Sequence, residues 1–425
     1  YYQVQIGGDM AALRGMVKYI LEQEKAVGGI LDTNFIADHT SGFEDYRKVV
    51  EAENWDNLVE QSGLSKEQIV EAAEVYIKAD KVICCWAMGL TQQKHGVATI
   101  QEVMSLLFLK GNIGRAGAGA CPVRGHSNVQ GDRTVGIIEK PKEEFLQSLD
   151  KAFNITSPRE HGFSVVHAIK AMKKEPGKIF FGMGGNFASA TPDTELTWEA
   201  LGNCRLTVHV STHLNRSHII TGEKALILPC LGRSELDIQA SGTQSVTVED
   251  SMSMVHASTG SNLPASTALK SEPAIVAGMG KALFANEPVN WDELLADYGN
   301  IREKIEEVLP DFKDYNLGIQ QKGGFHLRNS AAEREWRTAT GKARFIDNQL
   351  PTLSTPKGRL RLMTLRSHDQ YNTTIYDYND RYRGIKGERM IIFMNEEDIR
   401  EQGLTEQDRV KITSYAGDGK ERFAE

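Results

Sequence analysis

Long apolar runs are absent from this chain of 425 residues. A membrane-spanning helix needs roughly 18 consecutive apolar residues, and the most apolar stretches, 82–90 and 105–109, are far shorter and suit buried elements. The first residues also lack a charged region followed by an apolar one, so no signal peptide is predicted. The chain does not begin with Met, which suggests that the natural start lies upstream.

Paired cysteine motifs and blocks of like charge are missing too. The cysteines form no C-x-x-C pair, which excludes a zinc ribbon or a ferredoxin-type cluster within this sequence. An odd number at scattered positions is typical of a reducing compartment, so we expect a cytoplasmic protein with mostly buried cysteines. The net charge of -8 is spread along the chain, which argues against nucleic acid as the main partner. The cysteines are Cys84, Cys85, Cys121, Cys204 and Cys230.

The overall composition is typical of a soluble globular protein, and the length is enough for two or three domains. Helical spacing of apolar residues predicts a helix over 9–26, and the capping box from Ser65 to Gln68 opens another that runs to about Ala79. Strands then alternate with helices, which predicts parallel sheets covered by helices on both faces. The expected strands are 81–87, 178–183, 205–210 and 224–228, and the helices are 96–110, 194–201 and a short one from about Asn215.

The pattern changes after Gly260. Residues 271–311 are helical and polar and suit a connecting segment, whereas the chain from Gly358 is rich in strand patterns. Asp418-Gly419 is a strong hairpin signal, and because the chain ends six residues later, we expect it to stop inside a domain. The expected strands are 359–366, 388–394 and 408–414, with a short helix at 396–402.

Three polar segments could carry chemistry. In the first, Trp86–Gln92, Gly89 lets a ligand approach the backbone just past a strand, where Thr91 and Gln92 offer hydrogen bonds. The helix that follows could present its N-terminus to phosphate. The alternative is a glycine turn with a surface polar pair, because the segment fits neither G-x-G-x-x-G nor a Walker loop.

The second segment, 122–133, places polar side chains between glycines in a stretch too irregular for a helix. The planar fork of Arg124 suits a small carboxylate or oxyanion, and His126 can move protons near neutral pH. The alternative is a loop arginine in a structural salt bridge. The third segment, 365–374, follows an expected strand and suits an extended polar ligand, or it is an ordinary polar loop.

Together the three segments match one family in order and wording. Residues 86–131 resemble the molybdopterin oxidoreductases, with their run MG-x-(T/N)-Q, then GN-(I/L)-G, then G-P-(V)-RG-x-x-N-x-QG. Within the family the chain is similar to formate dehydrogenases and, through 124–136, to their YdeP-like relatives. Residues 36–43 and 225–229 also resemble family segments, and 366–374 resembles the start of the family's C-terminal pterin-binding barrel.

The resemblance implies a molybdenum or tungsten ion held by two molybdopterin guanine dinucleotides (bis-MGD). It places no metal ligand and no iron–sulfur ligand in this sequence, since both lie N-terminal to these motifs in the family. The implied cofactor-binding residues are Met88, Gly89, Thr91 and Gln92 for pterin or phosphate, Asn186, Ser211, Thr212 and Arg233 for guanosine diphosphate, and Arg366, Ser367, His368, Tyr371 and Asn372 from the barrel.

The implied fold consists of doubly wound parallel α/β domains of the formate dehydrogenase and DMSO reductase type, followed by the start of a double-psi β-barrel. We expect 1–123 to be the second half of one α/β pterin-guanine-dinucleotide-binding domain and 124–270 to be a second dinucleotide-binding domain. Residues 271–350 form a helical connection, and 351–425 form a truncated barrel.

The implied activity is a two-electron oxidation or reduction of a small anion such as formate. Arg124 occupies the position of the arginine that orients formate, and His126 stands where that motif usually carries a polar amide. Electrons would pass through a [4Fe–4S] cluster outside this sequence to an electron-transfer partner. We therefore expect the 425-residue chain alone to be inactive.

Three other interpretations compete with this one. His209 and His213 have the i, i+4 spacing of a zinc protease, with His218 nearby, but the glutamate is missing and the pair lies at a strand end. A nicotinamide-dependent dehydrogenase would need G-x-G-x-x-G after a strand, and no strand has it. A non-catalytic nucleotide-binding or scaffold subunit derived from the family is the third.

Overall fold

A computed structural model describes residues 1–126, 128–406, 408–416 and 418–424, and its first helical unit contains the largest buried core. Helices α1 (Asp9–Ala26), α5 (Lys66–Lys78) and α7 (Gly96–Leu109) confirm the sequence prediction to within one residue. The predicted capping box is formed, because the side chains of Ser65 and Gln68 each accept the other's backbone N–H. The other helices of the unit are α2 (Thr33–His39), α3 (Phe43–Ala52) and α4 (Trp55–Ser62).

A buried ion pair crosses this core. Arg14 of α1 and Glu102 of α7 are fully buried and form a bidentate contact, with Nε–Oε1 at 2.6 Å and Nη2–Oε2 at 2.9 Å. The hydroxyl of Tyr46 on α3 donates to the same carboxylate at 2.6 Å, and Arg14 Nη2 also donates to the carbonyl of Asn348 at 3.1 Å. Helices α1, α3 and α7 and the segment around Asn348 are therefore joined through this one ion pair.

The first sheet contains two parallel strands, β2 (Ile83–Trp86) and β3 (Gly119–Pro122). The sequence predicted a buried strand here, but Ile83 is 55% exposed. Cys84 and Trp86 pack against the helical core, whereas the alternate side chains point away from it. The strand is confirmed, but the prediction that it is buried was wrong. Helices cover one face of this short sheet and leave the other open. The short helix α6 (Met88–Thr91) follows β2.

A second sheet confirms the predicted parallel α/β pattern. Strands β4 (Ile179–Met183), β5 (Leu206–Ser211) and β6 (Lys224–Pro229) are parallel and lie in that order. Helices α10 (Val165–Lys174) and α12 (Thr194–Gly202) cover the face that carries Phe180, and α13 (Glu272–Leu283) packs on the other face. Short helices α11 (Phe187–Ala190) and η1 (Arg216–His218) follow β4 and β5.

A third group of elements surrounds a small antiparallel sheet, whose strand order is β11 (Phe325–His326), β10 (Met254–Ser258) and β9 (Val246–Glu249). The helices predicted over 271–311 are confirmed as α13, α14 (Trp291–Ala296) and α15 (Tyr298–Val308). The expectation that 122–133 is too irregular for a helix is wrong at its end, where the short helix α8 (Val129–Thr134) forms. The remaining elements are α9 (Glu143–Phe153), α16 (Tyr315–Gly318), η2 (Pro310–Phe312), β7 (Ile238–Gln239) and β8 (Gly242–Thr243).

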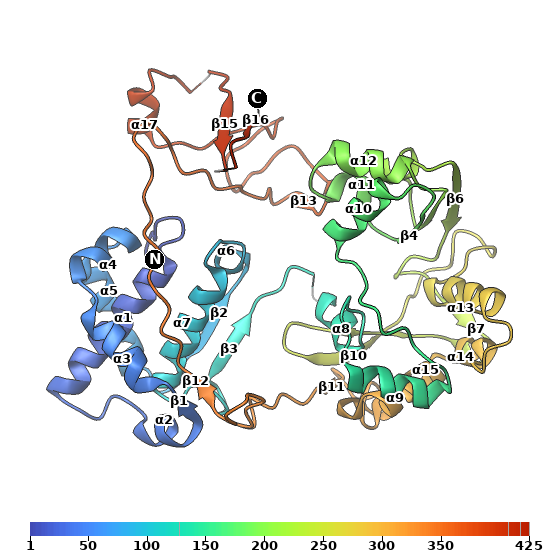
Figure 1. The fold of residues 1–425 in the computed structure, drawn as a ribbon, viewed down its shortest axis with the longest axis horizontal. Coiled ribbons are helices and arrows are strands. Elements are labelled where there is room, and N and C mark those ends of the chain that lie inside the picture. The colour runs from blue at the N-terminus through green and yellow to red at the C-terminus, as the bar shows by residue number, and fades with distance from the viewer. Residues whose placement is uncertain (127, 407, 417, 425) are drawn as a thin grey trace.

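The chain then returns to the first unit. Strand β12 (Ala343–Arg344) pairs in parallel with β1 (Thr40–Ser41), and Phe345 enters the first core. Figure 1 shows this return as the orange segment that passes from β11 to β12 and then up past α1 toward the C-terminal segment. The first unit is therefore built from two parts of the sequence.

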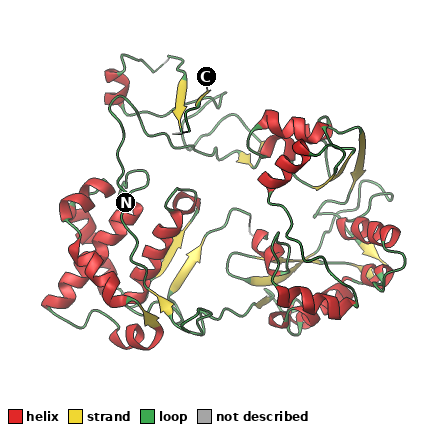
Figure 2. Ribbon diagram, viewed as in Figure 1, coloured by secondary structure: helices red, strands yellow, loops and turns green. Residues whose placement is uncertain are grey.

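The C-terminal segment contains few regular elements (Figure 2). The predicted helix and hairpin are confirmed, since α17 spans Glu396–Glu401 and β15 (Ile412–Tyr415) pairs with β16 (Glu421–Ala424) around Asp418-Gly419. The strands predicted over 359–366 and 388–394 are wrong, because no strand forms there. The only other pair in this described segment is β13 (Gln370–Tyr371) with β14 (Thr374–Ile375), so no barrel is formed by its described residues.

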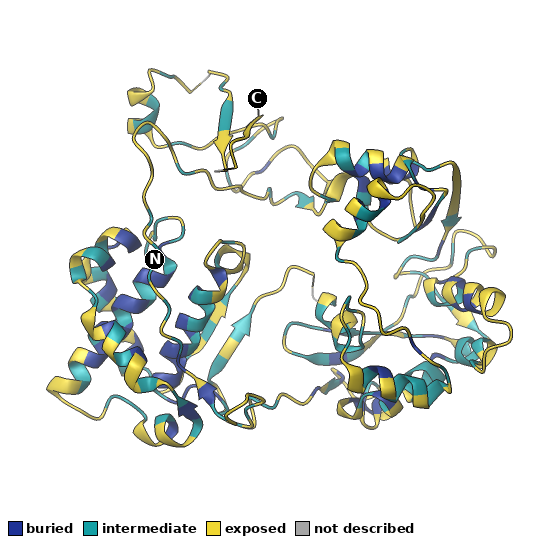
Figure 3. Cartoon of the chain, in the orientation of Figure 1, coloured by how far each residue is buried: buried dark blue, intermediate teal, exposed yellow. Residues whose placement is uncertain are grey.

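Missing strand partners explain this result. Leu360, Met390 and Phe393 are 53%, 75% and 55% exposed, and most of the segment is exposed or intermediate in Figure 3. A strand is stable only when a neighbour pairs with its backbone groups and its apolar face is covered. Within the described ranges neither condition is met at these positions. No helix in the described ranges has the length and apolar content needed to cross a bilayer.

Candidate functional site

The first two polar segments leave the same edge of the β2–β3 sheet. Trp86 and Pro122 are register partners at the ends of the two strands, and Val123 N–H donates to the Trp86 carbonyl at 2.7 Å. Met88 and Arg124 each follow two residues beyond this pair, and both are exposed. Parallel strands therefore bring the predicted pterin segment and the predicted anion-binding arginine to one edge. Ser127, in the second segment, lies outside the described residues.

The α6 turn leaves its backbone open. Gly89, Thr91 and Gln92 are exposed, and a Cβ added at Gly89 would meet no atom within 4 Å. The side chain of Gln93 donates to the Gly89 carbonyl and holds the turn from one side. A flat ligand can therefore approach this backbone from the open side.

A hollow of about 390 Å³ adjoins this turn. Lys94 and His95 line it from the connection between α6 and α7, and Arg361 lines it from the C-terminal side. Such basic groups favour an anionic part of a ligand. Sequence reasoning missed this hollow because Arg361 is far from the α6 turn along the chain and has no motif around it.

Four other predicted residues lie at the carboxyl ends of β4, β5 and β6. Ser211 ends β5 and Thr212 follows it, Asn186 follows β4, and Arg233 follows β6. Ligands in open α/β sheets bind beyond this edge. Ser211 is buried, Asn186 is half-buried, and Thr212 and Arg233 are exposed, with Arg233 Nη2 donating to Ser258 Oγ at 2.7 Å.

The turn after β4 needs glycine. Gly184 and Gly185 have φ of +66° and +71°, in the left-handed region that side chains rarely adopt, and no atom lies within 4 Å of a Cβ added at either. Asn215 Nδ2 donates to the Gly185 carbonyl at 2.7 Å and fixes the turn. The result is an open backbone surface beside hydrogen-bonding side chains.

The C-terminal segment reaches both earlier groups. Asn186 Nδ2 donates to Thr373 Oγ1 at 3.3 Å, and the ring of Tyr371 lies 5.0 Å from the ring of His126. Asn186 is held from its other side, since its Oδ1 accepts the Ser217 hydroxyl at 3.2 Å. The three predicted polar segments are thus linked in space, although the sequence separates them widely.

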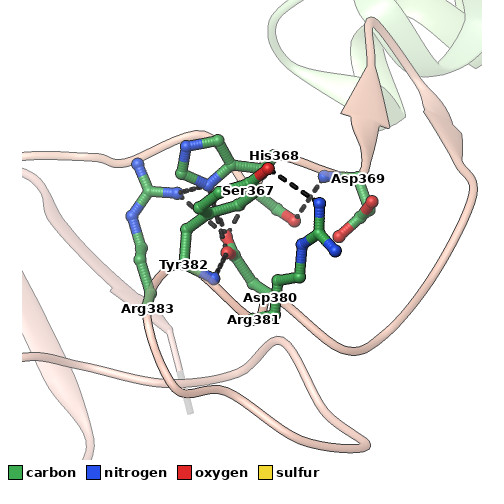
Figure 4. A network of polar contacts seen from close by, with 7 residues as sticks. All are labelled: Ser367, His368, Asp369, Asp380, Arg381, Tyr382 and Arg383. Carbon is green, nitrogen blue, oxygen red and sulfur yellow. Dashed lines mark hydrogen bonds and ion pairs between the residues drawn. The ribbon is translucent and has the colours of Figure 1, made fainter.

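A charged cluster organises this C-terminal segment (Figure 4). The carboxylate of Asp380 is 2% exposed and accepts the His368 backbone N–H at 3.1 Å and Arg383 Nη1 at 2.8 Å. Burial by itself raises the pKa of Asp380, but the hydrogen bonds from His368 and Arg383 outweigh it and hold that pKa well below its usual range. Asp380 is therefore ionised at neutral pH and anchors the segment.

The ring of His368 takes its orientation from the same cluster. Its Nδ1 lies 2.6 Å from Arg383 Nη1 and 3.1 Å from Asp380 Oδ1. Asp380 and Arg383 together hold the imidazole ring in place. Sequence reasoning named His368 but missed Asp380 and Arg383, which lie 12 and 15 residues further along and have no recognisable spacing.

The other predicted residues of this segment hold its turn. Arg366 Nη1 donates to the Asn372 carbonyl at 2.9 Å, and Ser367 Oγ accepts the Asp369 backbone N–H at 3.2 Å. Asn372 has a φ of +51°, a conformation that asparagine tolerates better than most residues. Any contact of these side chains with a ligand stays a prediction.

A buried histidine pair lies inside the β4–β6 sheet region. The rings of His209 and His218 are 5.1 Å apart, and the Nε2 atom of each is buried with no hydrogen-bond partner among the described residues. The pKa of His209 is lowered, first by burial and then by the charge of His218. No group of three metal-ligating side chains occurs in the described part of the chain, so the zinc interpretation gains no support.

This pair predicts a pH-dependent stability. Because the folded pKa of His209 lies below its unfolded value, the unfolded state binds the proton first as pH falls. We expect the β4–β6 unit to lose stability as pH drops below about 6.5, the unperturbed histidine pKa. His209→Gln should flatten this slope in urea unfolding between neutral and mildly acidic pH, whereas the exposed His161→Gln should not. Parallel slopes in wild type and His209→Gln would contradict the assignment.

Comparison with known proteins identifies two matching families. Residues 5–221 match the family described as Molybdopterin oxidoreductase, and residues 360–423 match the Molydopterin dinucleotide binding domain. The second match covers the segment that contains the Asp380 cluster. The two matches together include every predicted site residue except Arg233.

Relatives are similar over nearly the whole chain. An oxidoreductase of Mycobacterium tuberculosis (strain ATCC 25618 / H37Rv), named as uncharacterized, is 50% identical over 422 residues, which are 99% of this chain and 54% of the relative. Protein YdeP of Escherichia coli (strain K12) is 47% identical over 429 residues, and the match covers 99% of this chain and 56% of YdeP. A Staphylococcus haemolyticus protein whose name includes the term formate dehydrogenase is 35% identical over 162 residues, 38% of this chain and 16% of that protein.

The chain spans about half the length of the first two relatives. Among solved structures, acetylene hydratase from Pelobacter acetylenicus superposes with a TM-score of 0.53 at 15% sequence identity. The superposition covers 80% of this chain and 48% of that one. At this identity the likeness concerns the fold alone.

Proposed function

The chain belongs to the molybdopterin oxidoreductase family, and we propose that it supplies part of the site for a molybdenum or tungsten ion held by bis-MGD. The whole protein would oxidise or reduce a small anion such as formate by two electrons. Its electrons would pass through a [4Fe–4S] cluster, whose ligands are not in this sequence, to an electron-transfer partner. The 425-residue chain by itself would be inactive, and its cysteine pattern favours a cytoplasmic setting.

One observation carries this proposal: the third polar segment contacts both the second segment, through the His126–Tyr371 ring pair, and the β4 strand end, through the Asn186–Thr373 hydrogen bond. The register of β2 and β3 brings the first segment to the edge that the second one leaves. The donor set fits a dinucleotide cofactor. Open glycine backbone at Gly89 and Gly185 allows close approach, and Ser211 with Thr212 supplies hydroxyls at a strand-end edge.

When bound, the cofactor supplies the two-electron chemistry. The chain's own residues bind and orient. Arg124, at the β3 edge, would hold an oxyanion through its planar fork, and His126 would hold or accept a proton beside it. Tyr371 would position the His126 ring, and Asp380 fixes His368 and the cofactor-facing segment around it.

We also propose the domain division 1–123, 124–270, 271–350 and 351–425. The return of β12 to β1 adds one feature to this division, since residues 343–348 complete the first domain rather than only connecting two others. The separate parallel sheets β2–β3 and β4–β6 support the boundary between the first two domains.

The cofactor content of the whole protein tests the proposal. Molybdenum and tungsten would be measured by mass spectrometry, and guanine nucleotide would be released by acid from the same sample. We expect close to two guanine nucleotides per metal ion. Absence of both, from a host that loads such enzymes, would contradict the proposal and favour a non-catalytic scaffold subunit. Formate-dependent dye reduction by the 425-residue chain alone would contradict the expected inactivity.

A pair of matched glycine variants locates the site. Gly89→Val places a branched side chain on the open backbone of α6, and we expect metal and nucleotide content to fall several-fold. Gly278→Val makes the same change on α13, where an added Cβ also meets no atom within 4 Å, and should leave the content unchanged. Equal loss in both variants would indicate general destabilisation instead of a blocked site.

A further inference from the structure

Two cysteines face each other across the parallel pair β2–β3. Cys85 and Cys121 are register partners. Neighbouring strands lie about 4.8 Å apart, and the Cα atoms of disulfide-bonded cysteines are separated by about 4.4–6.8 Å. The ladder therefore places the two backbone positions within bonding range.

The cysteines are less buried than the sequence suggested. The expectation of mostly buried cysteines is wrong, because Cys204 and Cys230 are buried but Cys84 and Cys121 are half-buried and Cys85 is exposed. The exposure of Cys85 follows from the uncovered face of the β2–β3 sheet. An oxidant in solvent can reach this thiol.

The sulfur atoms on this face are close together. Cys121 Sγ lies 3.7 Å from Met252 Sδ, and Cys85 is the neighbouring thiol that acts on Cys121. Burial, and then the hydrogen bond and charge of Cys85, raise the pKa of the Cys121 thiol. Cys121 is therefore the slower thiol to react, and the exposed Cys85 is the one that an oxidant meets first.

We propose that Cys85 and Cys121 form a reversible disulfide, a modification site at the base of both loops of the candidate cofactor site. The oxidant is a peroxide. The Cys85 thiolate attacks one peroxide oxygen, so that an S–O bond forms, the O–O bond breaks, and the released hydroxide takes up the proton that the Cys85 thiol lost, giving one water. The Cys121 sulfur then attacks this sulfenic acid, the S–S bond forms as the S–O bond breaks, and the hydroxyl leaves with the Cys121 proton as a second water. In total, two thiols and one hydrogen peroxide give one disulfide and two waters.

The bond would act on the loops that follow it. Cys85 lies three residues before Met88, and Cys121 lies three residues before Arg124. A disulfide holds its Cβ atoms at about 3.5–4.5 Å. Oxidation therefore ties the carboxyl ends of β2 and β3 together covalently and restricts the start of both loops.

The exposure of Cys85 makes the bond easy to reduce. Strained or exposed disulfides have more oxidising potentials and are the labile ones. In a reducing compartment such a pair is a dithiol at rest and a disulfide only under oxidant. Disulfide formation depends on the strand register and not on the proposed catalytic activity.

Peptide mapping of the whole protein tests the proposal. Reduced protein would be treated with hydrogen peroxide, its remaining thiols alkylated, and its peptides analysed by mass spectrometry. We expect a cross-linked peptide pair joining Cys85 to Cys121, which dithiothreitol reverses. Cys84→Ala is the matched control, because Cys84 is adjacent in sequence but packs against the helical core. That variant should still form the bond.

A second measurement needs no oxidant. Phenylarsine oxide binds two close thiols, so it should protect Cys85 and Cys121 together from alkylation in the reduced protein. Cys85→Ser should leave Cys121 unprotected and should abolish the cross-linked peptide. Recovery of Cys85 as sulfinic acid with Cys121 freely alkylated, or a cross-link from Cys85 to a different cysteine, would overturn the proposal.

Discussion

Replacing Glu102 by glutamine is expected to destabilise the first helical unit by about 3–5 kcal/mol, because it leaves the buried guanidinium of Arg14 with only the partly exposed Glu53, 3.2 Å away, as an ion-pair partner. Water cannot solvate the charge of Arg14, since the side chains of Arg14 and Glu102 are both fully buried. Burial by itself lowers the pKa of Arg14, but the hydrogen bonds and charge of Glu102 outweigh it and raise that pKa. Without Glu102 these raising contributions are lost, but arginine still stays charged, because a guanidinium group is not deprotonated in proteins.

The substitution of Glu102 also affects Tyr46, the third residue of this buried cluster. Burial and the charge of Glu102 raise the pKa of Tyr46, so its hydroxyl is a permanent donor that requires an acceptor. Hydrogen exchange of the amides in α1 and α7 measures the opening free energy of this unit, and urea unfolding gives an independent value.

An exposed ion pair provides the matched control. Glu44 contacts Arg47 at 2.7 Å on the surface of α3, where its side chain is 61% exposed. Glu44→Gln should change stability by less than about 1 kcal/mol. The double variant Arg14→Met with Glu102→Leu should recover part of the loss, because it removes both charges. If Glu102→Gln and Glu44→Gln cost the same, the buried pair does not stabilise the unit as argued.

Arg124→Lys in the whole protein should lower kcat/KM for the anionic substrate by about 100-fold, the order of losing one preorganised donor to an oxyanion. Lysine keeps the charge but loses the planar pair of donors that matches a carboxylate. This prediction depends on the proposed function. It is measured as formate-dependent dye reduction, with metal and nucleotide content measured on the same sample.

Arg133→Lys is the control for this effect. Arg133 belongs to the same segment, but its side chain is 62% exposed and lies 4.0 Å from Glu139. This variant should retain nearly full kcat/KM. A large loss in Arg124→Lys together with loss of metal would assign Arg124 to cofactor retention instead of substrate binding. Unchanged kcat/KM in Arg124→Lys would remove it from the site.

Local signals predicted the elements that depend on local physics. The capping box at Ser65 and the spacing of apolar residues over 9–26 determine where α5 and α1 begin, and both are confirmed. The strands over 359–366 and 388–394 were predicted from the same kind of pattern, yet they do not form. A helix satisfies its own backbone, whereas a strand depends on a neighbour that its own sequence does not specify.

The candidate site shows the same difference between features that follow from local patterns and features that depend on distant segments. That Asn186, Ser211 and Thr212 would lie at strand ends followed from the order of strands and helices. The contact of Asn186 with Thr373 spans 187 residues, and nothing in either segment indicates it. Asp380 was missed for a related reason, since a single buried aspartate gives no periodic signal and its importance comes from the donors, among them His368 N–H and Arg383 Nη1, that fold around it.

The pairing of β1 with β12 also has a consequence for synthesis on the ribosome. Ser41 and Ala343 are 302 residues apart, so the first unit emerges long before the strand that completes it. At about 5–20 residues per second, the delay is roughly 15–60 s. During that time the site later filled by Phe345 is open, and the Arg14 guanidinium lacks the Asn348 carbonyl. The first unit is therefore completed only after residue 348 has left the exit tunnel.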